Sequence, residues 1–388
     1  MIELCKEMSC LKSFVYVSTA YANCPQEFID ERVYDPPMDP NKLLSLVECM
    51  DEKLAEDITP LLGAWPNTYT FTKAVAESIV AKEAGQLAVG IFRPAIVTST
   101  YREPLRGWID NLYGPTGVMV GAGTGIVRSV HCDGSKHVNL IPGDLTVNAL
   151  IACAWDVGQD NQVPVYNYVS KDNLLTYEQS KGICKKYGKE FPSAKAIWHC
   201  GFRNNKYKIV HTLYVYVLHL LPACFVDIRR HTRVRIRIKC NFLIVRRMLK
   251  MYKKMHQHMD VISYFAINDW EFSDNNVKAL LGKLTPEDRR NFAFDMTEVN
   301  WHHYYWIYLR GIRIYLLKDP LDTLPQALSI PSLFHLPYVG LSRWLYATVR
   351  YLFYRLYWIH QALKLILVYC LLQICGLTVS HLFQMGPL

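Results

Sequence analysis

The stretch Ser13-Phe-Val-Tyr-Val-Ser-Thr19 decides the fold, because a short run of β-branched and aromatic residues is typical of a buried parallel strand. A second such run, Leu87-Ala-Val-Gly-Ile-Phe-Arg-Pro-Ala-Ile-Val97, breaks at Pro94 as it leaves the sheet. Between the two runs, residues 65–80 have apolar residues at helical spacing after the start signal Pro66-Asn67. Strand, helix and strand in this order predict a doubly wound parallel sheet.

The segments that follow complete this prediction. Residues 43–58 and 146–157 have the spacing of helices, and residues 163–169 have the pattern of a late strand. Gly and Pro are frequent between residues 101 and 143, so we expect substrate-side loops there, including the run Gly121-Ala-Gly-Thr-Gly125. Beyond Lys171 the pattern becomes helical and aromatic.

Composition limits the class of protein. The 388 residues suggest two folded units, and a composition of 51% hydrophobic and 20% charged residues is too apolar for a disordered chain. The twelve cysteines are scattered without a CxxC pair, which indicates a reducing compartment and argues against structural zinc. The first residues lack a basic segment followed by an apolar one, so we expect no signal peptide.

The positive charge is concentrated in one segment. Residues 229–254 contain eleven Lys or Arg and no acidic residue, out of a net charge of +9 for the chain. No nucleic-acid module accompanies this run, so we expect no nucleic-acid partner. Attraction to an anionic membrane face, attraction to the phosphates of a nucleotide-bearing substrate, and simple solvation are the alternatives.

Two apolar stretches bear on location. Residues 209–226 carry no formal charge over eighteen residues, and residues 365–383 carry none over nineteen, close to the roughly 20 needed to span a bilayer. The second stretch is the better candidate, because four basic residues precede it and no Lys or Arg follows it, which predicts a cytosolic catalytic domain. A buried hairpin helix or a monotopic anchor is the alternative.

Tyr69 and Lys73 form a Y-x-x-x-K pair, which puts a phenol and an ammonium on one helix face. A nearby cation lowers the phenol pKa from its ordinary value of about 10, so that the phenol can protonate the oxyanion formed when hydride reaches a carbonyl. Ser18 and Thr19 end the first strand, where a hydroxyl can donate to the same oxygen, and we favour Thr19 for this role. A solvated Tyr–Lys pair is the alternative.

Several blocks lie in the same order along the chain as in one family. In the first half they are Phe14-Val-Tyr-Val-Ser-Thr-Ala-Tyr-Ala-Asn23, Trp65-Pro-Asn-Thr-Tyr-Thr-Phe-Thr-Lys-Ala-Val-Ala-Glu77 and Phe92-Arg-Pro-Ala-Ile-Val97. In the second half they are Trp270-Glu-Phe, Phe292-Ala-Phe-Asp-Met-Thr-Glu-Val-Asn-Trp301 and Gly311-Ile-Arg-Ile-Tyr-Leu-Leu-Lys318. Over about residues 10 to 320 the chain resembles the eukaryotic fatty acyl-CoA reductases, especially the insect members, which are extended short-chain dehydrogenases with a male-sterility-type domain.

The resemblance implies NADPH-dependent reduction of a long-chain acyl-CoA to a primary alcohol through a bound aldehyde, with release of CoA. It makes Tyr69 the proton donor and gives Lys73 a second role on the nicotinamide ribose. Thr19, with Ser18 beside it, would orient the carbonyl. The backbone expected to line the nicotinamide is that of Pro94, Ala95, Ile96 and Val97.

One feature of the family is not found. Its members begin with a strand and a T-G-x-x-G-F-type loop that holds the cofactor pyrophosphate, and residues 1–12 contain no such loop. We therefore expect the N-terminal cofactor-loop region to be missing from this chain. The alternatives are a catalytically inactive, truncated membrane-associated fragment or isoform, and a reductase of the same superfamily acting on sterols or sugar nucleotides.

The predicted architecture is α/β: a truncated doubly wound, Rossmann-like parallel sheet, a mainly helical C-terminal domain and a C-terminal membrane helix. The expected domains are a partial NAD(P)-binding reductase domain at 1–200, a helical domain at 205–325 and a membrane-anchoring segment at 340–388. The expected partners are acyl-CoA and membrane lipid. The endoplasmic reticulum is favoured over the peroxisome, because Met-Gly-Pro-Leu388 is not an S-K-L-type address. The sequence carries no signal for oligomeric state.

For three further features we favour a structural role. His302-His303 and His256-x-His258 lack a supporting Cys or carboxylate array, so we expect no metal site. The aromatic residues from Trp301 to Trp306 are expected in the core of the helical domain, with lining for an acyl chain as the alternative. Glu77 is expected to be a charge on the helix surface rather than an acid catalyst.

Overall fold

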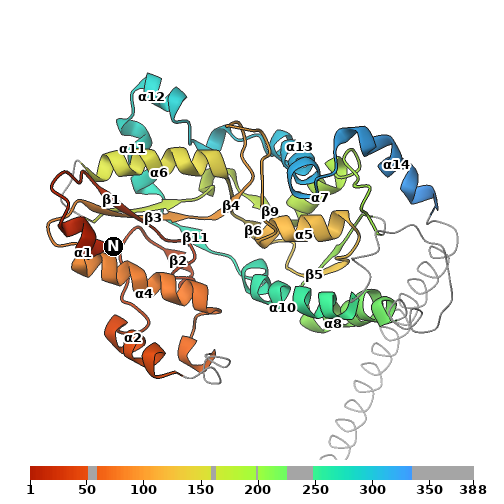
Figure 1. The fold of residues 1–388 in the computed structure, drawn as a ribbon, viewed down its shortest axis with the longest axis horizontal. Helices are drawn as coiled ribbons and strands as arrows, with labels where there is room; N and C mark the ends of the chain where they lie inside the picture. The colour runs from red at the N-terminus through yellow and green to blue at the C-terminus, as the bar shows by residue number, and fades with distance from the viewer. Residues whose placement is uncertain (51–58, 159–162, 198–199, 225–247, 334–388) are drawn as a thin grey trace, which may run out of the picture. The chain divides into compact units, whose positions relative to one another are not determined.

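A parallel sheet of three strands, in the order β1 (Phe14–Val17), β3 (Val89–Pro94) and β8 (Val165–Tyr168), forms the centre of the fold (Figure 1). The computed structural model describes residues 1–50, 59–158, 163–197, 200–224 and 248–333. Every residue of β3 and β8 is buried, as continuous apolar runs predict. The expectation of a fully buried first strand is wrong, because β1 has a strand partner on one side only within the described residues and Val17 is 39% exposed.

Helices cover both faces of this sheet, as expected for an α/β fold. α4 (Thr68–Glu83) and α6 (Gly143–Val157) lie on opposite faces, and both contact β3 (Figure 1). The side chain of Asn67 caps α4 by accepting a hydrogen bond from the Thr70 N–H at 2.9 Å, which confirms the start signal read from the sequence. α11 (Asn275–Lys283), from the second half of the chain, also contacts β8 and α6.

The described part of the chain also contains four shorter strand pairs. Three are parallel: β4 (Ile96–Thr98) with β7 (Leu140–Pro142), β2 (Phe28–Ile29) with β11 (Glu271–Phe272), and β5 (Ser129–His131) with β10 (Arg203–Asn205). One is antiparallel: β6 (His137–Val138) with β9 (Leu175–Thr176). Since β2 and β11 are far apart in sequence, their pairing joins the two halves of the chain.

The glycine-rich segment expected to be a loop is mostly helical. α5 (Gly114–Gly123) contains the first three residues of the Gly121–Gly125 run, and Gly125 follows with φ +78°, a conformation that ends helices and favours glycine. A Cβ added to Gly117 would lie 2.3 Å from the Leu112 carbonyl oxygen, and one on Gly121 would lie 2.4 Å from the Val127 side chain. The glycines therefore permit close packing of a helix.

The remaining helices lie mainly in the second half of the chain, which confirms its predicted helical character. In the second half they are α8 (Lys208–Val215) with the π-helical turn η3 (Tyr216–Leu220), α10 (Met248–Ile267), α12 (Pro286–Asn291), α13 (Trp301–Gly311) with the π-helical turn η6 (Ile312–Leu316), and α14 (Leu324–Leu333). The first half adds α1 (Ile2–Lys6), α2 (Pro40–Cys49) and α7 (Tyr177–Tyr187). Short helical turns are η1 (Thr59–Leu62), η2 (Lys171–Asn173), η5 (Met296–Glu298) and η7 (Leu321–Thr323).

The aromatic residues of α13 are core residues, as predicted. Tyr304, Tyr305 and Tyr308 are each fully buried, and their phenols form hydrogen bonds with hydroxyl groups from other parts of the chain. The partners are Thr98 and Ser99 for Tyr304, Ser180 for Tyr305 and Thr116 for Tyr308. Helix α13 therefore packs against elements of the first half, and residues Met1–Leu328 form one compact unit.

Within the described ranges, no helix has the length and apolarity needed to cross a bilayer. The predicted span at residues 365–383 lies outside the described residues, as does the anchoring segment 340–388. The other apolar stretch, from residue 209, begins within α8 and continues through η3.

Candidate functional site

Two hydroxyl side chains follow β1 at its carboxyl end. Ser18 and Thr19 are 3% and 6% exposed, and the Ser18 N–H donates to the Phe92 carbonyl at 2.8 Å, which fixes this end of the strand on β3. Thr19 Oγ1 accepts a hydrogen bond from the Tyr21 N–H at 3.3 Å. Ser18 Oγ is buried and has no hydrogen-bond partner among the described residues. Leaving a buried hydroxyl without a hydrogen-bond partner costs folding free energy. The Ser18 hydroxyl is therefore available to donate to an oxygen of a molecule bound at this position.

Tyr69 is in the first turn of α4, and the Thr19 hydroxyl lies close enough to the Tyr69 phenol to influence its pKa. Partial desolvation raises the pKa of the phenol although the side chain is 56% exposed, and the polar contact with Thr19 acts in the opposite direction. The structure thus brings the predicted phenol and the predicted hydroxyl together. The phenol is protonated at neutral pH and has an exposed route to solvent.

Lys73 lies one turn further along α4, and its Nζ donates to the Val17 carbonyl at 2.7 Å. The same ammonium lies 5.0 Å from the centre of the Tyr16 ring, in cation–π geometry. In β1, the N–H groups of Phe14 and Ser18 bond to the β3 side of the strand, so the carbonyl of Val17 points to the opposite edge. Lys73 satisfies that edge carbonyl.

The expected lowering of the Tyr69 pKa by Lys73 is therefore corrected. The pKa of Tyr69 is raised rather than lowered, because partial desolvation outweighs the polar contact with Thr19. The Lys73 ammonium is instead bound to the β1 edge, and its own pKa is lowered by burial while nearby Glu77 opposes that shift. The pair is close in space, as predicted, and its catalytic roles remain predictions.

The backbone expected to line a nicotinamide is largely engaged within the protein. The Pro94 carbonyl accepts from the Ala20 N–H at 2.9 Å, and the Ala95 N–H donates to the Tyr168 carbonyl at 3.0 Å. The Ile96 N–H donates to the Asn139 carbonyl at 3.1 Å. Val97 differs, because its side chain is 48% exposed. Of the four predicted residues, Val97 has the most accessible side chain. Val97 can therefore contact a bound molecule through its side chain.

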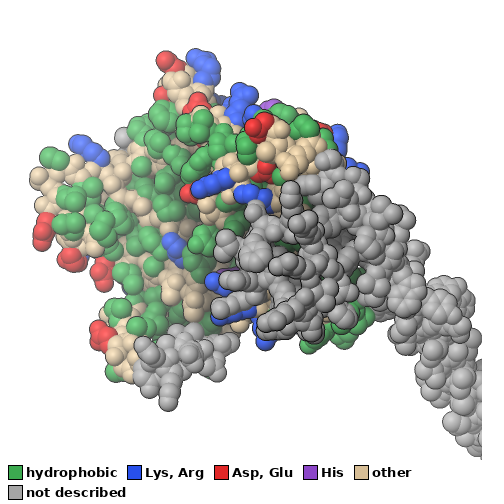
Figure 2. Space-filling view, turned by 45° about the vertical axis from the view of Figure 1, so that its right-hand side comes forward, with side chains coloured by type: hydrophobic (Ala, Val, Ile, Leu, Met, Phe, Trp, Pro, Cys, Tyr) green, Lys and Arg blue, Asp and Glu red, His purple; other side chains and the backbone are tan. Residues whose placement is uncertain are grey.

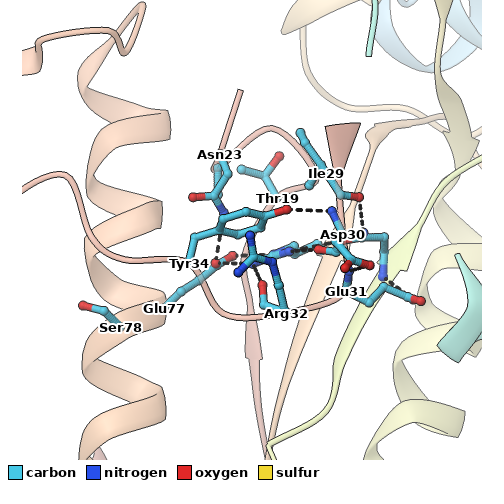
Figure 3. A network of polar contacts seen from close by, with 12 residues as sticks. Thr19, Asn23, Ile29, Asp30, Glu31, Arg32, Tyr34, Glu77 and Ser78 are labelled. Atoms are coloured by element: carbon cyan, nitrogen blue, oxygen red, sulfur yellow. Dashed lines mark hydrogen bonds and ion pairs between the residues drawn. The ribbon is translucent and has the colours of Figure 1, made fainter. Parts of the chain in front are cut away.

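Glu77 is not a surface charge, contrary to expectation. Its carboxylate forms a bidentate ion pair with Arg93, with Nε–Oε1 and Nη2–Oε2 distances of 2.8 and 2.7 Å, and both side chains are almost completely buried. Arg93 also donates to the carbonyls of Asp30 at 3.0 Å and Arg32 at 2.9 Å. The pair joins α4 to β3 and to the loop after β2 (Figure 3).

The same network extends to the second half of the chain through Glu31. Its carboxylate accepts from the backbone N–H of Asn167 at 3.2 Å and of Asn276 at 2.8 Å. Burial raises the pKa of Glu31 to about 7, and these backbone hydrogen bonds oppose the shift. The sequence did carry one signal for the network: Arg93 lies inside an otherwise apolar strand, and a charge in that position requires a buried partner.

The histidines considered as metal ligands have other neighbours. Among the described residues, no group of His, Cys, Asp and Glu side chains has the arrangement of a metal site. His256 stacks on His219, with ring centres 5.1 Å apart, and His302 packs edge-on against Tyr187.

Comparison with known proteins shows which family the chain resembles. Two family models match the chain, both described as male sterility protein, over residues 1–150 and 218–319. The chain is 39% identical over 332 residues to fatty acyl-CoA reductase wat of Drosophila melanogaster. It is 35% identical over 331 residues to fatty acyl-CoA reductase 1 of both Xenopus laevis and Homo sapiens. Each match covers 84% of this chain and 62% of the relative, so the chain spans less than two thirds of these proteins.

Proposed function

This chain belongs to the fatty acyl-CoA reductase family, and we propose from that membership that it reduces a long-chain acyl-CoA to a primary fatty alcohol with NADPH. The observation that carries the proposal is the contact between Tyr69 and Thr19, next to the unpaired hydroxyl of Ser18. Together these groups offer hydrogen-bond donors and a proton to one substrate oxygen at the end of a parallel strand.

Different side chains stabilise and protonate the substrate oxygen. NADPH, when bound, supplies the hydride for each of two reductions. Ser18 and Thr19 donate hydrogen bonds to the carbonyl oxygen and stabilise the negative charge that develops on it. After the first reduction the carbon–sulfur bond breaks, CoA leaves as the thiol after taking up a proton, and an aldehyde remains. After the second, Tyr69 gives its proton to the alkoxide, a role suited to a phenol with a raised pKa.

The residues at this position fit the nicotinamide end of the cofactor. Lys73 presents a partly exposed ammonium close to Tyr69, where it can donate to a ribose hydroxyl. Val97 is exposed in β4, the short strand that directly follows β3. We assign Tyr69, Lys73 and Val97 to contacts with the nicotinamide riboside.

The test is turnover by the chain of residues 1–388. With palmitoyl-CoA as substrate, we expect NADPH oxidation, free thiol and hexadecanol, with two NADPH consumed for each alcohol because a thioester must accept two hydrides. The matched controls are Tyr69→Phe in the site and Tyr113→Phe on the surface, where Tyr113 is 83% exposed. A folded chain that binds no NADPH and releases no thiol would contradict the proposal and support the inactive-fragment alternative.

We also propose that the protein is held at a membrane by a single span at residues 365–383, with the reductase domain in the cytosol. The support is the sequence pattern, nineteen residues without formal charge after a basic segment. Protease treatment of intact microsomes should degrade the reductase domain. Protection of that domain would contradict this orientation.

A further inference from the structure

The helix formed by α8 and η3 buries two histidines and exposes several apolar side chains. A surface helix normally turns its apolar side chains inward, yet here His211 and His219 are the buried ones, at 6% and 0% exposure. Ile209 is 85% exposed and Tyr216 is 61% exposed. We call the following exposed apolar residues in and around this helix the α8 face: Tyr207, Ile209, Leu213, Tyr216 and Leu221.

Hydrogen bonds fix the helix in this orientation. His219 Nε2 accepts from the Arg128 N–H at 2.9 Å, so the proton of the neutral ring is on Nδ1, which donates to His256 Nε2 at 3.1 Å. His211 Nδ1 bonds to the hydroxyl of Ser129 at 2.8 Å. Rotation of the helix to bury Ile209 would break these bonds. The apolar residues are therefore held outward.

The surroundings of the α8 face are basic. α10 packs against η3, and α8 and α10 lie side by side (Figure 1). The two helices together contain four exposed lysines and a single acidic residue, Asp260. The lysines are Lys208, Lys250, Lys253 and Lys254. Figure 2 shows Lys and Arg side chains scattered among hydrophobic ones on the described surface of the molecule.

We propose that the α8 face lies on an anionic phospholipid membrane, with its apolar residues among the upper parts of the acyl chains and the neighbouring lysines at the phosphates. Apolar residues flanked by lysines are typical of helices that bind in the membrane interface. A second copy is a poor partner, because two such faces would bring like charges together.

The test is photocrosslinking of the full chain bound to vesicles. Benzoylphenylalanine replaces Tyr216 in one variant and Leu44 in the control, because Leu44 is 59% exposed on α2, a helix with a comparable amphipathic pattern. The vesicles contain phosphatidylcholine alone or with phosphatidylserine. We expect a lipid adduct at position 216 with the anionic vesicles and at most a trace at position 44. Lys208→Gln with Lys250→Gln should lower the adduct yield several-fold, as should high salt.

Each other outcome overturns the proposal. An adduct between position 216 and a peptide of the same chain would mean that the protein covers this face itself, and an adduct with another copy would make it a dimer interface. Equal yields of lipid adduct at positions 216 and 44, or equal yields with neutral and anionic vesicles, would show that the α8 face does not bind an anionic membrane specifically. The adduct forms without NADPH or acyl-CoA, so a chain inactive as a reductase still gives a decisive result.

Discussion

The substitution Glu77→Gln tests whether the buried ion pair holds the catalytic helix in place. It keeps the shape of the side chain and removes the negative charge next to Arg93, whose side chain is completely buried. Breaking a buried pair by removing one partner generally costs about 3–5 kcal/mol, because the other charge is left uncompensated. Arg93 keeps its bonds to the carbonyls of Asp30 and Arg32, so we expect the lower end, about 3 kcal/mol. Since domains are stable by about 5–15 kcal/mol, this loss is large.

The assay is urea denaturation followed by tryptophan fluorescence. Glu83→Gln is the matched control, because Glu83 is on the same helix but exposed. We expect the control to change the free energy of unfolding by less than about 0.5 kcal/mol. In the double variant with Arg93→Met, the combined loss should be smaller than the sum of the single losses, because no unpaired charge remains. If Glu77→Gln behaves like Glu83→Gln, the pair does not secure the helix and this reasoning is refuted.

Three further predictions concern the site and the histidines. Tyr69→Phe should lower kcat/KM for acyl-CoA by about 10²-fold or more through loss of the proton donor, and a change below tenfold in steady-state assays would exclude that role. Ser18→Ala should lower kcat. The midpoint of urea unfolding should stay unchanged or rise, because the substitution removes a buried hydroxyl that has no hydrogen-bond partner among the described residues. A marked loss of stability would show that Ser18 Oγ does form a hydrogen bond in the folded protein. Burial lowers the pKa of His211 to about 4 and of His219 to about 3, below the value of about 6.5 in the unfolded chain, so the unfolded state binds more protons as the pH falls. As the pH falls from 6.5 to about 4, the free energy of unfolding should therefore decrease by up to about 2.7 kcal/mol per pH unit. The charged or titratable groups around the two rings are His131, His256, Asp260, Lys208 and Arg128. A urea midpoint that does not change between pH 6.5 and 5 would refute the lowered pKa values of the two histidines.

The parts of the fold read correctly from the sequence are those set by local pattern. The strand at Val89–Pro94 and the helix at Thr68–Glu83 follow from apolar spacing, from Asn67 as a cap and from Pro94 as a strand end. The same local blocks placed Thr19, Tyr69 and Lys73 in one region, because the ends of parallel strands and the helices beside them converge there. Residues that belong to one βαβ unit need little tertiary information to be brought together.

The errors arise where distant residues decide the outcome. Gly121 appeared to be in a loop, but its missing side chain is what allows α5 to pack against Val127. Glu77 has a surface-like helical spacing until Arg93, on another element, is known to face it. β1 has the composition of an inner strand, yet its burial depends on its neighbours and not on its own residues. In each case the missing information is a contact between separate segments.

The contacts of α4 explain why stability and catalysis should be linked in this protein. Tyr69, Lys73 and Glu77 are four residues apart, so they form one stripe on the helix that faces the sheet. The Tyr69 phenol contacts Thr19 and the Lys73 ammonium donates to the Val17 carbonyl, both at the end of β1, which is an edge strand among the described residues, and these contacts are partly exposed. Glu77 bonds to Arg93 on β3, which is fully buried. Among these polar contacts, the buried pair at Glu77 constrains the rotation and height of α4 most, because the contacts at the edge are partly exposed. A change there should move the Tyr69 phenol relative to Thr19 before it unfolds the helix.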